Sequence, residues 1–245
     1  PMSAIDPIDH IPAFERQPEF IAAGGSITRI PNDSLSGVPT GARFNGSIIN
    51  WRGKTLMAYR QYNPHRRMRT IWPEDKKNGA TQAAQARDIA ISVLGADWLP
   101  TGEHTIVRFP IRHGDECFED PRLFVFQDSL WMACVYFLAV PGGCLCHQYL
   151  YRLNDEFQIE HGLKIYIGKN LGGARDWEKN WTFFTHGQSE AEKKLILLYN
   201  VAEMQTHEID AKTGVNKAGW IGRKLVWPFG MMRGGTSPVQ LPDGT

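Results

Sequence analysis

Four short polar segments recur along the chain, and each opens a stretch with the pattern of an apolar β-strand. They are residues 44–47 (FNGS), 119–122 (EDPR), 178–181 (EKNW) and 233–236 (RGGT). In the first three copies a polar turn and a second strand follow, as in 123–126, the turn 127–129 and 130–134. The fourth copy has one strand, 237–241, and stops at the turn 242–244. Recurrence of this kind predicts one structural unit repeated along the chain.

The spacing of these segments leaves room for two more strands in each repeat. The steps from Asn45 to Asp120, Asn180 and Gly235 are 75, 60 and 55 residues. The outer halves alternate apolar and polar side chains around Asn, Asp or Gly turns: 88–94 with 104–109, 147–153 with 163–167, and 204–210 with 223–227. This is the pattern of half-buried hairpins. We therefore expect an all-β propeller built of four-stranded antiparallel blades.

The number of repeats bears on domain organisation. Three blades are complete, and a fourth has only begun at Thr245. A closed propeller has about 4 to 8 blades, and open sheet edges aggregate. We expect residues 43–245 to form a propeller domain truncated after the start of blade four. Residues 1–42, with several prolines, glycines and serines and little periodicity, are expected to form an N-terminal arm packed on it.

Charge and cysteine content exclude some function classes. A net charge of +1 gives no reason to expect nucleic acid or an anionic membrane as a partner. No apolar run approaches the roughly 18 residues of a spanning helix. The cysteines, at 117, 134, 144 and 146, lack the second ligand pair of a zinc site, so we expect free, mostly buried thiols and no metal. Free thiols favour a reducing, cytoplasmic location.

The propeller hypothesis brings the recurring segments together, because the innermost strand of every blade starts near one mouth of the central channel. The convergent set is Asn45, Glu119, Asp120, Arg122, Glu178, Lys179, Asn180, Arg233 and Thr236. Carboxylates, cations and amides suit sugar hydroxyls, which both donate and accept hydrogen bonds. Cleavage of a glycosidic bond needs an acid for the leaving oxygen and a nucleophile on the other face. We therefore predict a carbohydrate-active enzyme with an oligosaccharide or glycoside substrate.

The segment 119–122 resembles the signature of glycoside hydrolase family 130, and 178–181 and 233–238 resemble segments at equivalent places in relatives. The resemblance covers roughly residues 41–245. It implies a five-bladed propeller that acts on β-mannosides, as a phosphorylase or a hydrolase. Related propellers are β-1,2-mannosyltransferases. The resemblance implies no cofactor, with inorganic phosphate as co-substrate of a phosphorylase, and the sequence leaves a homo-oligomer possible.

The same resemblance implies roles for single residues. Asp120 would be the proton donor, and Arg122 would hold a substrate group or brace Asp120. The structural alternative for Arg122 is an ion pair with Glu119. Phosphorolysis would need cations for phosphate, for which the candidates are Arg60, Arg122, Lys179 and Arg233.

Hydrolysis would instead need a second carboxylate to activate water, and Glu178 is the candidate; its alternative is a salt bridge with Lys179 or Arg233. Trp181, beside the motif, is the predicted platform for a sugar ring, whereas Trp51 and Trp131 are expected in the core.

Two other functions stay open. The basic segment 65–69 (HRRMR) could clamp the phosphates of a sugar nucleotide, which would favour a glycosyltransferase, or be a solvated loop. A propeller could also bind glycan without turning it over, since propellers host many functions.

Overall fold

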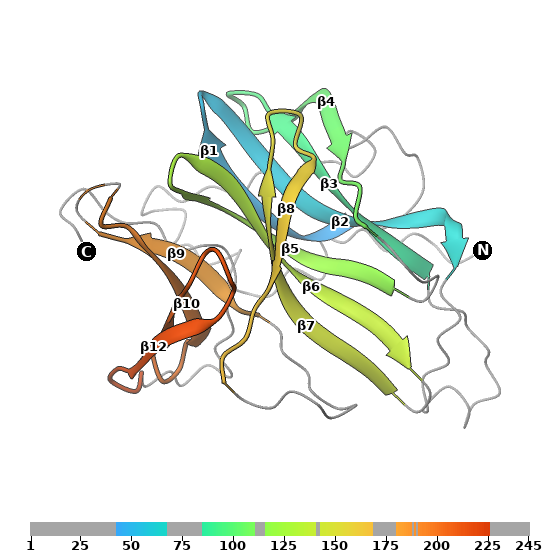
Figure 1. Ribbon diagram of the computed structural model, residues 1–245. Helices are drawn as coiled ribbons and strands as arrows, with labels where there is room; N and C mark the ends of the chain where they lie inside the picture. Colours follow the sequence, from blue (N-terminus) through green and yellow to red (C-terminus); the bar gives the residue numbers. More distant parts are fainter. Residues whose placement is uncertain are drawn as a thin grey trace, which may run out of the picture.

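Three antiparallel sheets of four strands each form the described part of the chain (Figure 1). This computed structural model describes residues 43–67, 85–110, 116–140, 143–168, 180–187, 189 and 191–225. All regular elements in these ranges are strands, and none of the described residues lies in a helix long and apolar enough to cross a membrane. Both the N-terminal arm predicted at 1–42 and the fourth repeat lie outside the described residues.

Every sheet is a meander in which strand order follows chain order. The first sheet contains β1 (Arg43–Trp51), β2 (Lys54–Arg67), β3 (Gln85–Leu94) and β4 (Pro100–Ile106). The second contains β5 (Glu116–Phe126), β6 (Ser129–Val140), β7 (Gly143–Leu153) and β8 (Ile159–Lys164). The third contains β9 (Thr182–His186), β10 (Lys194–Asn200), β11 (Gln205–Ile209) and β12 (Asn216–Ile221). The prediction of four-stranded antiparallel units is confirmed for these three repeats.

The turns between the first two strands of the first and second sheets lie where the sequence predicted them, because both are tight hairpin turns. Between β5 and β6 the two turn residues, Gln127 and Asp128, both have positive φ, 48° and 51°. Between β1 and β2 the same holds for Arg52 and Gly53, at 46° and 76°. Two central residues with positive φ make the turn whose twist matches a hairpin.

The outermost strands begin earlier than the sequence pattern predicted. The fourth strand of the third sheet was predicted at 223–227 but is β12, at Asn216–Ile221. Its turn is tight: Gly214 has φ +74°, and its N–H donates to the carbonyl of Asp210. The strand is also largely exposed, with Trp220 at 49% and Ile221 at 74%, so its apolar residues mark no buried face. Because the prediction relied on buried apolar residues, it placed this strand several residues after its true start at Asn216.

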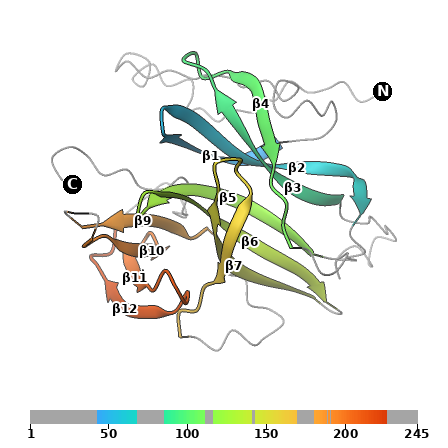
Figure 2. The same cartoon turned by 45° about the horizontal axis from the view of Figure 1, so that its top comes forward.

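The second sheet is packed on both faces, as the two views show (Figures 1 and 2). Leu123 and Met132 face the first sheet, in a core that includes Leu56 and Ile91. Their neighbours in sequence, Phe124, Trp131 and Ala133, face the third sheet and pack with Phe183, Leu195 and Leu197. Successive side chains of a strand point to opposite faces, so one alternating strand pair supplies both cores.

The first strands of the three sheets meet one another. β5 contacts both β1 and β9. The backbone N–H of Leu123 in β5 donates to Oγ of Ser47 in β1 at 2.9 Å, a buried hydrogen bond that links the first two sheets. Segments far apart in the sequence are thus in contact where β5 meets β1 and β9.

Candidate functional site

The recurring motif coincides with a backbone irregularity at the start of each inner strand. In β1 the register shifts between Phe44 and Ser47, on either side of Asn45, and in β5 it shifts between Glu119 and Arg122. Asp120 has φ +53°, and Asn180, two residues before β9, has φ +62°. Asn and Asp are the non-glycine residues that most readily adopt this left-handed conformation. A backbone irregularity thus lies in or just before each of these three strands, as a register shift in β1 and β5 and as a positive φ at Asp120 and Asn180.

Asp120 lies in a buried charged cluster between the first two sheets. Nη1 of Arg60, from β2, lies 2.6 Å from Oε2 of Glu119 and 3.2 Å from Oδ1 of Asp120. The side chains of Arg60, Glu119 and Asp120 are 13%, 6% and 11% exposed. One guanidinium from the neighbouring sheet therefore holds two adjacent carboxylates of β5. Sequence reasoning selected Arg60 as a phosphate-binding candidate, but nothing in the local sequence indicated this pairing.

Arg122 is the second cation of the cluster. It is 8% exposed, and its Nη1 donates to the carbonyl oxygen of Pro121 at 3.1 Å. Burial lowers the pKa of the Arg122 guanidinium, the Asp120 carboxylate acts in the opposite direction, and the charge of Arg60 lowers it further. The charges of Asp120 and Arg60 therefore both act on the Arg122 guanidinium, so two guanidinium groups interact with the Asp120 carboxylate.

Two cysteines form part of the wall of this cluster. Sγ of Cys117 donates to Oε1 of Glu119 at 3.9 Å. Burial raises the pKa of the Cys134 thiol well above its usual value, and the Asp120 carboxylate raises it further. Cys117, Cys134 and Cys146 are buried, as the sequence predicted; the side chain of Cys144 lies outside the described residues. The position of Cys134 beside Asp120 was missed, because it follows from the pairing of β6 with β5.

The prediction for Trp181 is wrong. Its side chain is 3% exposed and packs in the core between the second and third sheets, with its ring centroid 5.4 Å from that of Tyr199. A ring in this position supports sheet packing and presents no face to a sugar. Trp131 lies in the same core, as predicted, and Trp51 is half-buried beside the first core.

The other predicted site residues divide into two groups. Asn180 is half-buried at the start of the third inner strand, so it shares the bend with Asp120. Glu178, Lys179, Arg233, Thr236 and the side chain of Asn45 lie outside the described residues. The described part of the site is therefore the set Arg60, Glu119, Asp120, Arg122 and Asn180.

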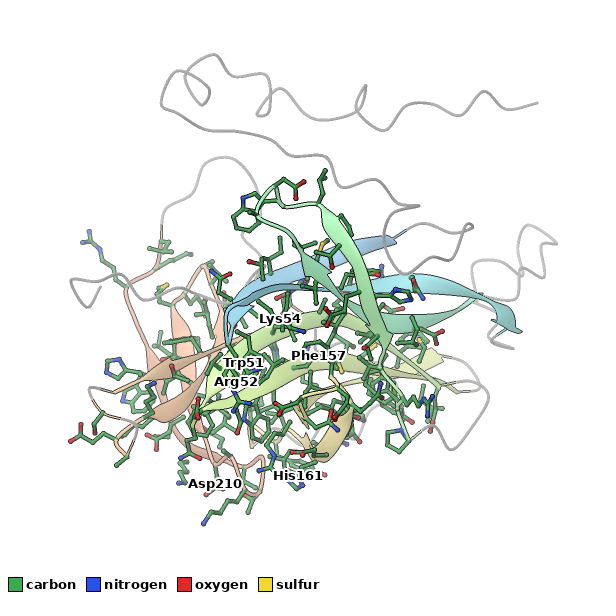
Figure 3. All side chains as sticks on the ribbon, turned by 90° about the horizontal axis from the view of Figure 1, so that it is seen from above. Trp51, Arg52, Lys54, Phe157, His161 and Asp210 are labelled. Atoms are coloured by element: carbon green, nitrogen blue, oxygen red, sulfur yellow. The ribbon has the colours of Figure 1, made fainter. Side chains whose placement is uncertain are left out.

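The ends of β1 and β5 that lie away from the motif carry exposed charges rather than buried ones. A cavity of about 390 Å³ lies there among the turn residues, beside Trp51 and Arg52 (Figure 3). Arg52 forms a 2.8 Å ion pair with Asp155 and stacks over Trp51 at 4.7 Å from the ring centroid. Both ion-pair partners are more than half exposed, so the pair is worth little. The buried charges gather at the motif end.

Comparison with known proteins adds three structural likenesses. No family model and no curated protein matches the chain. An α-L-arabinofuranosidase from Lactobacillus brevis is 10% identical with a TM-score of 0.46, and covers 81% of this chain and 59% of its own. An α-L-arabinofuranosidase from Fusarium graminearum, in complex with an iminosugar inhibitor, is 8% identical with a TM-score of 0.47, over 81% of this chain and 54% of its own.

The third is described as a putative glycoside hydrolase from Parabacteroides distasonis. It is 11% identical with a TM-score of 0.44, over 80% of this chain and 61% of its own. The chain thus spans 54% to 61% of the length of these structures. At these TM-scores the likenesses carry no conclusion about its chemistry, and the family 130 resemblance stays a prediction.

Proposed function

We propose that this chain is part of a carbohydrate-active enzyme that cleaves or transfers β-linked glycosides, with Asp120 as the proton donor. The observation that supports this most is the buried cluster at the bend of β5. There the Asp120 carboxylate lies 3.2 Å from Nη1 of Arg60 and beside Arg122. Charges in such a water-poor place interact strongly, which fixes the position of the Asp120 carboxyl group at the bend.

A five-bladed propeller is the architecture that we propose around this cluster. The contacts of β5 with β1 and β9 support it, as does the Ser47–Leu123 hydrogen bond between neighbouring inner strands. Thr182 stands two residues after Asn180, as Ser47 stands two after Asn45. Its Oγ1 is buried and has no hydrogen-bond partner within the described residues. A further inner strand beside β9 would supply that partner, as β5 does for Ser47.

The proposed reaction begins with the glycosidic oxygen. Asp120 gives its proton to that oxygen, directly or through a sugar hydroxyl, as the bond to the anomeric carbon breaks. Phosphate then attacks the anomeric carbon in a β-mannoside phosphorylase, held by Arg122 with Lys179 and Arg233. In a hydrolase, water attacks instead, with Glu178 as its base. Arg60 is already paired with Glu119, so its role in this scheme is to position the two carboxylates.

The deciding experiment replaces Asp120 with Asn and measures turnover of β-mannosides with and without phosphate. Asn tolerates the left-handed φ, so the fold should persist, while general acid catalysis contributes roughly 10²- to 10⁴-fold in rate. We expect a loss of that order in kcat. Asp128→Asn is the matched control, because Asp128 also has a positive φ, 51°, in an exposed turn after the same strand.

Each result of this experiment selects one function. Phosphate-dependent release of sugar phosphate identifies a phosphorylase, and phosphate-independent release identifies a hydrolase. Turnover only with a sugar nucleotide identifies a transferase. Glycan binding without turnover identifies a binding module, in which the Arg60–Asp120 pair is structural. Unchanged activity in Asp120→Asn removes Asp120 from the mechanism.

A further inference from the structure

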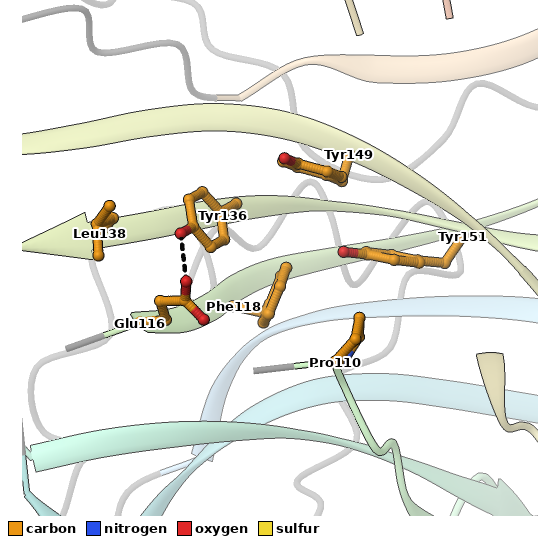
Figure 4. Close-up of a pocket in the computed structure, with 7 residues that line it drawn as sticks. All are labelled: Pro110, Glu116, Phe118, Tyr136, Leu138, Tyr149 and Tyr151. Atoms are coloured by element: carbon orange, nitrogen blue, oxygen red, sulfur yellow. Dashed lines mark hydrogen bonds between the residues drawn. The ribbon is translucent and has the colours of Figure 1, made fainter. Parts of the chain in front are cut away.

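An aromatic pocket of about 270 Å³ opens on the face of the second sheet that is turned toward the first (Figure 4). Its walls are Tyr136 from β6 and Tyr149 and Tyr151 from β7, with Phe118 from β5. The rings of Tyr149 and Tyr151 stack at a centroid distance of 5.9 Å and an interplanar angle of 10°. Exposed Pro110 and half-buried Leu138 complete the lining, so the pocket is reached from solvent.

One side of the pocket carries a buried carboxylate. Glu116, at the start of β5, is 4% exposed, and its Oε1 accepts a 2.7 Å hydrogen bond from the Tyr136 hydroxyl. The hydroxyls of Tyr149 and Tyr151 are directed toward the same side, where Tyr136 and Glu116 lie (Figure 4). The pocket therefore combines flat apolar walls with several oxygen atoms at one end.

Tyr151 is the group that points to a ligand. The residue is 3% exposed, and its hydroxyl has no hydrogen-bond partner within the described residues. Burial raises the pKa of Tyr151, so the group stays neutral and keeps its proton to donate. A ligand in the pocket that accepts a hydrogen bond would pair with this hydroxyl.

The size and chemistry of the pocket select among ligands. Pockets for drug-sized ligands are roughly 300 to 1,000 Å³, so this one suits a single small ring. A neutral hydroxyl needs a partner that donates and accepts, which a sugar hydroxyl does and an ammonium ion does not. The half-buried rings of Tyr136 and Tyr149 suit the apolar face of a sugar ring. An ammonium ion would contact the same rings and Glu116 but could not accept a hydrogen bond from the Tyr151 hydroxyl, so it is the competing ligand in the test.

We propose that this pocket binds a single pyranose ring, with Tyr151 as the hydroxyl that fixes its orientation; this rests on the proposed carbohydrate function. Cys134 connects the pocket to the charged cluster, because it pairs with Tyr149 of β7 and lies opposite the bend of β5 that carries Asp120. A ring bound here would lie in the same inter-sheet space as Asp120 and serve as a neighbouring subsite for the substrate.

The test is a calorimetric titration of the Asp120→Asn protein with methyl β-D-mannopyranoside, methyl β-D-glucopyranoside and tetramethylammonium. We expect saturable binding of a pyranoside and none of tetramethylammonium. Adding Tyr151→Phe removes one hydroxyl and keeps the ring, and should weaken binding about three- to tenfold. Leu138→Trp should fill the pocket and abolish binding. Tyr166→Phe is the matched control, since Tyr166 is 50% exposed, and should leave affinity unchanged.

Three results would overturn the proposal: no saturable pyranoside binding, binding of tetramethylammonium instead, or pyranoside binding that Tyr151→Phe and Leu138→Trp leave unchanged in folded protein. Near-ultraviolet circular dichroism verifies that the variants are folded. Because binding is measured without turnover, its outcome is separate from that of the proposed reaction. If sugar binding depends on Tyr151 but the native protein shows no turnover, the proposal of a pyranose-binding pocket stands and the proposal of an enzymatic activity fails.

Discussion

At the scale of single residues, backbone conformation determines which side chains the recurring motif can hold. The sequence showed that positions 45, 120 and 180 are equivalent, and the structure gives the reason, a bend with positive φ at Asp120 and Asn180. The pairing of side chains could not be predicted. The sequence offered Arg122, its near neighbour, as an alternative ion-pair partner of Glu119, whereas it gave no sign that Arg60 contacts Glu119 from another sheet.

The bend at Asn180 can be tested through stability. Asn180→Gly should change the free energy of unfolding by less than about 1 kcal/mol, because glycine accepts positive φ freely. Asn180→Val should cost about 1 to 2 kcal/mol more, because a β-branched residue is strained there. Urea unfolding of the two variants measures the difference, and equal stabilities would show that the bend imposes no strain.

At the scale of elements, turn chemistry made the inner hairpins predictable and the outer strands less so. Alternation located the turn between β5 and β6 correctly, but the predicted strands 123–126 and 130–134 are only parts of β5 and β6, which extend beyond the bend at Asp120. β12 was misplaced because it is an exposed edge strand, and exposure removes the periodic signal on which such predictions depend.

The turn after β11 contributes a pH-dependent stability. Oδ1 of Asp210 accepts hydrogen bonds from the backbone N–H groups of Lys212 (2.8 Å) and Thr213 (3.0 Å), and Oδ2 pairs with Lys217 at 3.2 Å. The N–H of Lys212 first, and then Lys217, lower the pKa of Asp210 from 3.8 to about 2. A lowered folded-state pKa gives stability that is complete above the unfolded value and lost as pH falls through the folded value.

Replacing Asp210 with Asn should therefore reduce stability at neutral pH and make no difference at low pH. The gap between the native protein and Asp210→Asn should close as pH falls from about 4 to about 2. Urea unfolding at a series of pH values measures the gap. Asp97→Asn, in the exposed turn between β3 and β4, is the control. A gap of constant size over this range would mean that the Asp210 charge contributes nothing.

At the scale of the molecule, stability depends on the two cores between sheets. The sequence predicted repeated blades, yet it could not show that the second sheet would be enclosed on both sides. That outcome depends on its neighbours: Met132 reaches the first sheet and Trp131 the third only because both sheets are present.

Loss of packing between the second and third sheets should be costly. Leu197 is fully buried in that core, so Leu197→Ala should lower the free energy of unfolding by about 2 to 5 kcal/mol. Ile221, which is 74% exposed at the edge strand, provides the matched control: Ile221→Ala should stay within about 0.5 kcal/mol. Similar losses for both variants would mean that this core does not hold the sheets together.

Each meander uses one unbroken stretch of the polypeptide, so its ladders connect residues close in sequence. Short-range pairing is quick to form, whereas contacts between distant residues wait on slower chain closure. The Arg60–Glu119 pair joins residues of two different sheets, so it forms only when the second sheet docks on the first, and the charges around Asp120 are assembled late.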